Sequence, residues 1–328
     1  MATSPRFDRG SYRLAVAALL CAVPLVLFGG SVTTLGAGMA VEGWLIAEGH
    51  FLLFFPIDSW LRDVGTFVEH THRLFGMLVG AVAVAACVRA WIKVRSTGAW
   101  FATAALVAVI LQGALGGFRV LEDSPQLAFL HGVFAQATFG LLAASAVVLS
   151  ARWSAGAEGR ASDESADGMR RLRAIALVTA VVVFGQVFLG AWYRHGLRPT
   201  PAPGIETRLA LHFAGAAVAF FAVVVLAAVL LRAARSTSGA RATALTRAAR
   251  NLRALLGVQI ALGLFAWVGF RPGAIGPMEW GLSILHVLCG ALLFAQCGAA
   301  VLWSVRLAGR RAQERYAVPA SGLPEGAR

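Results

Sequence analysis

The sequence predicts an all-α integral membrane protein with eight transmembrane helices. Hydrophobic residues make up 58% of its 328 residues and charged residues only 14%, against about 25% charged residues in soluble domains. The mean hydropathy is +0.72. One water-surrounded core cannot bury so much apolar surface, so the composition excludes both a soluble two-domain enzyme and a disordered chain.

Eight apolar segments are each long enough to cross a bilayer, which takes about 20 helical residues. Inside lipid every backbone polar group needs a partner within its own segment, so each segment is expected to be a helix. The first segment follows a basic N-terminus, but it is long and seven more follow, so we expect an uncleaved span and not a signal peptide. The expected spans are residues 13–33, 67–91, 98–119, 127–150, 172–193, 208–232, 252–271 and 280–305.

Basic residues are distributed unequally between the two sides of these spans. With the N-terminus inside, 22 of the 29 Lys and Arg residues fall in inner segments, as the positive-inside rule requires. We therefore expect a multi-pass protein of a bacterial-type cell membrane, or of the inner mitochondrial membrane, with both termini cytoplasmic. The net charge of +13 is then a topology signal and not a nucleic-acid-binding face.

Cysteine placement argues against disulfides and zinc, because all four cysteines lie in apolar segments without a CxxC pair. The most polar stretch, residues 151–171, divides the chain into two halves that are weakly alike. LQGALGGFRV at 111–120 corresponds to VQIALGLFAWVGF at 258–270, and each precedes a helix with a Leu-His pair. Such repeats are common in membrane proteins. We expect two pseudo-symmetric four-helix bundles, residues 1–160 and 161–328.

Four histidines lie inside the expected spans, one on each even-numbered helix: His72, His131, His212 and His286. Each comes early in a helix that runs inward, so all four are expected at similar depth in the outer leaflet. A single intramembrane histidine is as often a packing residue as a functional one, but four at one depth favour function. Two pairs of neutral imidazoles in an apolar bundle suit bis-histidine heme, and nothing supplies the third ligand that zinc needs.

Small residues follow each of these histidines by about one helical turn and share its face. We interpret them as room for a porphyrin, with close helix packing as the alternative. They are Gly76, Ala135, Gly215, Ala216 and Gly290.

The segment EHTHR at 69–73 carries further candidates. Glu69 shares a helical face with His72, where a carboxylate is able to accept protons or stabilise positive charge beside a heme edge. The alternative is an interfacial carboxylate paired with Arg73 or water. Arg73 and Arg194 each have a guanidinium group, which suits a heme propionate. For Arg194 the alternative is an anchor at the membrane interface. His70 points elsewhere on the helix and is expected at an interface.

The outer connection, residues 34–66, is rich in aromatic residues. We expect these rings to rest on the membrane surface, with a cover over the heme site as the alternative. His50 and His195 are expected in outer loops and not as ligands.

These motifs resemble the heme A synthase family of cytochrome oxidase assembly, over roughly residues 25–305. They are Gly29-Gly30 followed by GAGMAVEGW, ExxHR at 69–73, QGALGG at 112–117, GAWYRH at 190–195, and the three further histidines. The resemblance implies an oxidoreductase that oxidises a porphyrin methyl group of heme O to the formyl group of heme A through two hydroxylations.

The resemblance also implies residue roles. His72 and His131 would flank the substrate heme O, His212 and His286 would ligate a resident heme b, and Glu69 would be the catalytic carboxylate. Heme O would come from a heme O synthase, a protoheme farnesyltransferase, and the reaction would need an electron donor.

The sequence departs from the family pattern in two places. Thr33 stands where the family often has arginine, and residues 34–66 contain no cysteine pair, which excludes a thiol-dependent step. Two other functions stay open: a bis-histidine b-type cytochrome for membrane electron transfer, and a heme carrier or transporter without chemistry. A cytochrome would need the four histidines but not Glu69.

Overall fold

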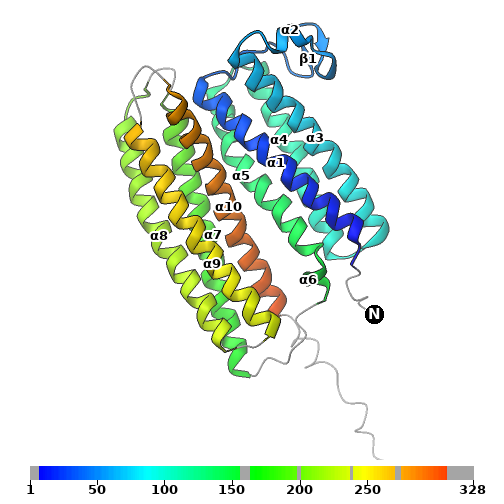
Figure 1. Ribbon diagram of the computed structural model, residues 1–328, viewed down its shortest axis with the longest axis vertical. Helices are drawn as coiled ribbons and strands as arrows, with labels where there is room; N and C mark the ends of the chain where they lie inside the picture. The colour runs from blue at the N-terminus through cyan, green and yellow to red at the C-terminus, as the bar shows by residue number, and fades with distance from the viewer. Residues whose placement is uncertain (1–6, 156–162, 198–200, 237–238, 270–274, 309–328) are drawn as a thin grey trace, which may run out of the picture.

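The computed structural model describes residues 7–155, 163–197, 201–236, 239–269 and 275–308. These residues form mainly long α-helices (Figure 1). Eight of the helices are long and apolar enough to cross a membrane, which confirms the predicted spans. They are α1 (Arg9–Leu35), α3 (Val64–Lys93), α4 (Thr97–Leu121), α5 (Pro125–Val148), α7 (Asp163–His195), α8 (Ile205–Arg235), α9 (Gly239–Gly269) and α10 (Pro277–Ala308).

The polar stretch between the halves is more helical than a simple linker. A short helix, α6 (Ala151–Ser154), follows α5, and α7 begins at Asp163, ahead of its apolar part, which begins at Arg170. Residues 156–162 of this stretch lie outside the described residues. The apolar pattern locates where a helix crosses lipid, but a helix continues into water wherever its residues tolerate that conformation.

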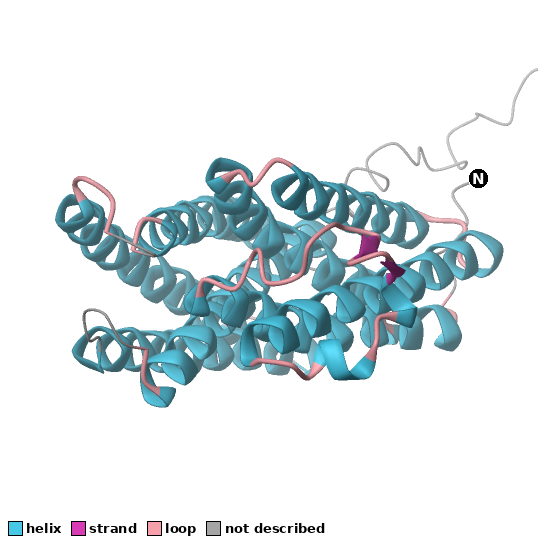
Figure 2. Ribbon diagram, turned by 90° about the horizontal axis from the view of Figure 1, so that it is seen from above, coloured by secondary structure: helices cyan, strands magenta, loops and turns pink. Residues whose placement is uncertain are grey.

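The spanning helices of each half contact one another in the same closed order. In the first half the order is α1, α3, α4, α5 and back to α1, and in the second it is α7, α8, α9, α10 and back to α7. The halves meet where α1 and α5 contact α10 and where α5 contacts α7. Seen from above, the long helices run side by side (Figure 2).

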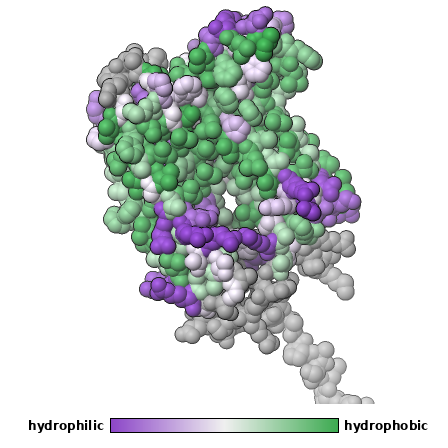
Figure 3. Space-filling model, viewed as in Figure 1, coloured by the Kyte–Doolittle hydropathy of each residue, from purple (hydrophilic) through white to green (hydrophobic). Residues whose placement is uncertain are grey.

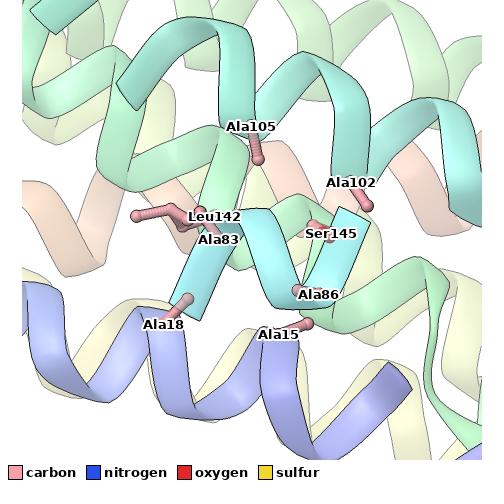
Figure 4. A pocket seen from close by; sticks show the side chains of 8 residues that line it. All are labelled: Ala15, Ala18, Ala83, Ala86, Ala102, Ala105, Leu142 and Ser145. Atoms are coloured by element: carbon pink, nitrogen blue, oxygen red, sulfur yellow. The ribbon is translucent and has the colours of Figure 1, made fainter. Parts of the chain in front are cut away.

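The two halves are packed with different side chains. Leucine and valine fill the interior of the second half, where Val223, Leu226 and Leu252 are fully buried. Alanine is prominent in the first half, so its helices approach closely. A void of about 10 Å³, about the space of one water molecule, lies among these alanines (Figure 4). It contacts Ala83, which follows His72 by eleven residues on α3, about 16 Å along the helix, so the void is separate from the histidines.

Large apolar side chains face outward along the helices. Val181 is 64% exposed and Phe221 is 65% exposed, and one whole side of the molecule is broadly hydrophobic, with hydrophilic residues towards its two ends (Figure 3). A surface of this kind is stable against lipid and not against water. The chain is therefore a multi-pass membrane protein.

Residues 36–63 cover one end of the first half, which we call the loop end (Figure 1). They contain two antiparallel strands, β1 (Ile46–Ala47) and β2 (His50–Phe51), a 3-10 turn (Leu52–Phe54) and a short helix, α2 (Ile57–Trp60). Glu48 and Gly49 join the strands, both with positive φ, as a two-residue hairpin requires. This hairpin is a small exception to the predicted all-α fold.

At the opposite end, Asp8 caps α1 and ties it to α3. Its carboxylate accepts hydrogen bonds from the Ser11 amide at 2.7 Å and from Arg89 Nε at 2.8 Å. The bond from Arg89 is the main reason that the pKa of Asp8 falls from 3.8 to about 2.

We expect Asp8→Ala to lower the free energy of unfolding by about 1 kcal/mol at pH 7, the usual value of an N-cap. A carboxyl whose pKa is lowered on folding stabilises the protein above its unfolded pKa of 3.8, and this stabilisation disappears as the pH falls towards 2. Melting temperatures in detergent measure the difference. Asp58→Ala, at an exposed position of the short helix α2, is the control, and an equal effect of both changes would refute the cap.

Candidate functional site

The imidazoles of His72 and His131 face each other across the first half. Their ring centres are 6.2 Å apart, and the ring planes are nearly perpendicular at 86°. His72 Nδ1 donates to the Leu25 carbonyl of α1 at 3.0 Å, because a carbonyl oxygen only accepts. His131 Nδ1 lies 3.0 Å from Gln112 Nε2 of α4, and this same amide donates to the His131 carbonyl at 2.7 Å.

The second half repeats this pair with His212 and His286. Their ring centres are 6.3 Å apart and their planes meet at 79°. His212 Nδ1 lies 2.9 Å from Gln186 Nε2 of α7. His286 Nδ1 donates to the Gln259 carbonyl of α9 at 3.1 Å, while its Nε2 lies 3.2 Å from the Gln259 side-chain Nε2. The two pairs therefore have the same spacing and nearly the same mutual orientation.

Each of the four imidazoles lies against a glycine of the preceding spanning helix, which we call its glycine seat. A Cβ atom on any seat would come within 2.7 to 3.0 Å of the histidine Cε1 atom, tighter than nine in ten real Cβ contacts. A side chain at a seat would therefore force the ring to shift from its observed position. The seats, in the order of His72, His131, His212 and His286, are Gly29, Gly116, Gly190 and Gly263.

Glu69 lies three residues before His72 on α3, and its carboxylate is fully buried. Oε1 accepts from Arg73 at 2.8 Å and lies 3.6 Å from Arg119 of α4, while Oε2 accepts from the Val41 amide at 2.9 Å. Two guanidinium groups offset the cost of burying this charge. The contact with Val41 fastens the covering loop directly to Glu69.

Arg73 also fastens the loop. Its terminal nitrogens donate to the carbonyls of Val41 and Gly43 at 2.8 and 2.7 Å, in addition to Glu69. A propionate would therefore have to share or replace loop contacts at Arg73. Arg119, a residue that the sequence did not single out, donates to the Gly38 carbonyl at 3.1 Å.

The loop aromatics divide between the interior and the surface, so the expectation that they rest on the membrane is partly wrong. Phe55 is buried and stacks on His70, and Trp60 Nε1 donates to Thr71. The Trp44 ring lies against Gly117 of α4. Phe54, by contrast, is 77% exposed. His70 thus holds the loop, and the inward-facing aromatic residues of the loop pack against the helices at one end of the first half.

Arg194 and His195, at the end of α7, reach from the second half into the first. Arg194 donates to the Gly30 carbonyl and to the Thr34 hydroxyl of α1. The His195 ring lies against Phe129 of α5, and its Nε2 would meet a Cβ on Gly132, the residue after His131, at 2.8 Å. His195 therefore ends a helix and does not lie in a loop as expected.

The histidine pairs suit a metal ion that already has other ligands. A metal–imidazole nitrogen bond is about 2.0 Å long, so two imidazoles on opposite sides of one ion have ring centres about 6 Å apart, as observed in both pairs. Within the described parts of the chain, no three His, Cys, Asp or Glu side chains gather into a metal site. A heme iron, to which the porphyrin contributes four nitrogens, therefore fits the donor set better than zinc.

The fold and the site together define a polytopic helical membrane protein with two intramembrane imidazole pairs suited to heme. The family of the cytochrome oxidase assembly protein matches residues 12–297. The chain therefore belongs to this family, which confirms the resemblance of its motifs.

A curated relative is the Heme A synthase of Paracoccus denitrificans (strain Pd 1222), which is 31% identical over 126 residues. The aligned part covers 36% of this chain and 32% of the relative. The chain thus matches about a third of that relative's length.

Sequence reasoning missed the glycine seats and the glutamines beside three of the histidines. A signal for both was present, because QGALG at 112–116, QVFLG at 186–190 and QIALG at 259–263 share the pattern QxxLG. The first half has LVLFG at 25–29 in the equivalent place. The repeating unit is thus one helical hairpin, with the seat on its first helix and the histidine on its second. It occurs four times along the chain, and this repeat is clearer than the likeness of the two halves.

We expect Arg73→Ala to loosen the loop end. Hydrogen bonds from a charged group contribute about 1.5–3 kcal/mol each, so amide exchange at residues 41–44 should speed up at least tenfold, as measured by hydrogen–deuterium exchange. Arg62→Ala removes an exposed loop ion pair with Glu48 and serves as the control. Equal exchange in the two variants would show that Arg73 does not fasten the loop.

Proposed function

We propose that this protein is a heme A synthase-like oxidoreductase that oxidises a porphyrin methyl group of heme O to the formyl group of heme A. The observation that carries the proposal is the repeated imidazole pair, with ring centres 6.2 and 6.3 Å apart. Membership of the cytochrome oxidase assembly family and the similarity to a relative named Heme A synthase support the same reaction.

In this proposal each half holds one heme. His72 and His131 bind the substrate heme O in residues 1–160, and His212 and His286 bind a resident heme b in residues 161–328. When bound, a bis-histidine heme b supplies one-electron transfer. The glycine seats fix where each imidazole lies, and the apolar helices exclude water from both sites.

Glu69 is the residue that we assign to catalysis. It lies three residues before His72 and so projects from the same side of α3. Arg73, Arg119 and the Val41 amide engage both of its oxygens. The carboxylate would have to share these contacts to stabilise positive charge at the methyl carbon or to direct a water molecule to it.

The propionates of heme O suit the charges of this region. Arg73 and Arg119 lie on either side of the Glu69 carboxylate, and Arg194 reaches from the second half to α1. Their positive charges suit the two negative propionates. We assign propionate binding to Arg73 and Arg194, as the sequence suggests, and add Arg119.

The loop end would face the outside of a bacterial-type cell membrane, or of the inner mitochondrial membrane, since the basic residues concentrate at the opposite end. The histidine pairs would then lie in the outer leaflet half. A heme O synthase that delivers the substrate and an electron donor complete the set of expected partners.

We expect Glu69→Gln to retain heme but to lower heme A formation at least 100-fold, the usual contribution of a positioned acid or base. The measurement is extraction and mass analysis of heme from cells that express the protein and make heme O. Glu122→Gln, at an exposed position at the end of α4, is the control. Full conversion by Glu69→Gln would indicate an electron-transfer cytochrome, conversion by no form of the protein would indicate a carrier, and wild-type protein without heme would refute the whole proposal.

We expect Gly116→Val to abolish the low-spin heme absorption of the first site, because a side chain there would collide with the His131 ring. Gly113→Val is the matched control, since a Cβ at this position of the same helix meets nothing within 4 Å. Heme per polypeptide, measured on purified protein, distinguishes them. Equal heme content in both variants would show that the seat does not position a heme ligand.

A further inference from the structure

Three of the four imidazoles are contacted by a glutamine side chain that lies one helical turn before the glycine seat. The glutamines are Gln112, Gln186 and Gln259, and Leu25 occupies the fourth equivalent position. Glutamine is costly inside a membrane unless its amide finds partners. Its recurrence at one position of a fourfold unit therefore needs an explanation beyond packing.

The glutamines of the second half contact both of its histidines. Gln186 Nε2 lies 2.9 Å from His212 Nδ1 and donates to the His212 carbonyl at 2.9 Å. The Gln259 amide lies 3.2 Å from His286 Nε2. In the first half the Gln112 amide lies at His131 Nδ1, as the Gln186 amide lies at His212 Nδ1. Nδ1 of His72 and of His286 instead donates to a backbone carbonyl.

The small residues that follow the histidines make room for these side chains. A Cβ on Gly215 would collide with Gln186 Oε1, and a Cβ on Gly290 would lie 3.4 Å from the Gln259 amide nitrogen. At the equivalent place in the first half, a Cβ on Gly76 would lie 3.9 Å from the Leu25 side chain. Gly215 and Gly290, which the sequence suggested as room for a porphyrin, therefore accommodate glutamine side chains.

We propose that Gln112 and Gln186 are positioning residues for the heme-ligating imidazoles of His131 and His212, one in each half. This inference rests on the proposed function. A polar partner at the second ring nitrogen fixes the rotation of a ligating imidazole, and its loss usually costs 10–100-fold in metal affinity. Each half has one such glutamine, and the other histidine of each half donates from Nδ1 to a backbone carbonyl.

The amide of glutamine suits both states of the ring. An imidazole that ligates iron through Nε2 carries its proton on Nδ1 and needs an acceptor there. A half-turn of the Gln186 amide brings Oε1 to Nδ1, in exchange for its bond to the His212 carbonyl. Oε1 of Gln186 is buried, and among the described residues it has no hydrogen-bond partner, so this oxygen is available.

The test measures heme retention and reduction potential in full-length protein purified from cells that make heme O. Transfer of heme to excess apomyoglobin should show a fast and a slow phase, which His72→Ala and His212→Ala assign to the first and second site. We expect Gln186→Leu to speed the slow phase at least tenfold. Gln186→Glu should retain the heme and lower its midpoint potential, because a carboxylate acceptor makes the imidazole a stronger donor to ferric iron.

Thr179→Val is the matched control for the second site. Thr179 is buried seven residues before Gln186 on the same helix, and it also donates across to α8, at the Ala222 carbonyl. The inference is overturned if Gln186→Leu changes heme loss and potential no more than Thr179→Val does. Wild-type protein without heme would instead overturn the proposed function, so the two failures are distinguishable.

Discussion

The arrangement depends on one constraint, the placing of four polar rings inside an apolar helix bundle. An imidazole in hydrocarbon is costly unless its nitrogens have partners, and each ring here has a carbonyl or an amide at Nδ1. Each ring edge also needs space, which a glycine on the preceding helix provides. Because the same hairpin supplies partner, space and ring, the unit is repeatable, and four copies give two facing pairs.

The second feature is the coupling of charge to the loop end. Glu69, the fully buried carboxylate three residues before His72, is bonded to the loop backbone through Val41 and to Arg73, which itself holds the loop carbonyls. The loop therefore does more than connect two spans, since the position of Glu69 depends on it. No cysteine occurs in residues 34–66, and here hydrogen bonds to buried charges and the packing of Phe55 on His70 hold the loop in place.

Much of the fold was predictable from the sequence because a bilayer imposes simple rules on length and polarity. The eight spans and the four histidines followed from apolar runs and from polar residues that interrupt them. The helical extension before Arg170 and the Glu48–Gly49 hairpin were not predicted. They lie outside the apolar spans, where the hydropathy of the sequence does not predict secondary structure. The inward turn of Phe55 and Trp60 depends on contacts with His70 and Thr71, and composition alone does not reveal such contacts.

The site was predictable in its residue types and less so in its partners. Glu69 beside His72 follows from helical spacing, whereas Arg119 approaches Glu69 from another helix, at a separation of 50 residues that spacing cannot relate. The glutamines and seats were detectable as QxxLG at 112–116, 186–190 and 259–263. Their role became clear only from the structure, because the imidazole that each glutamine and glycine contacts lies on the following helix.

The central claim is that two facing imidazoles ligate a heme iron in each half. Electron paramagnetic resonance of the purified ferric protein tests this claim most directly. Ring planes at 86° and 79° predict the strongly anisotropic low-spin signal that perpendicular axial imidazoles give. Substituting any one of the four histidines should convert one site to a high-spin or heme-free form. A wild-type spectrum with only high-spin iron, or one that no histidine substitution alters, would contradict the account.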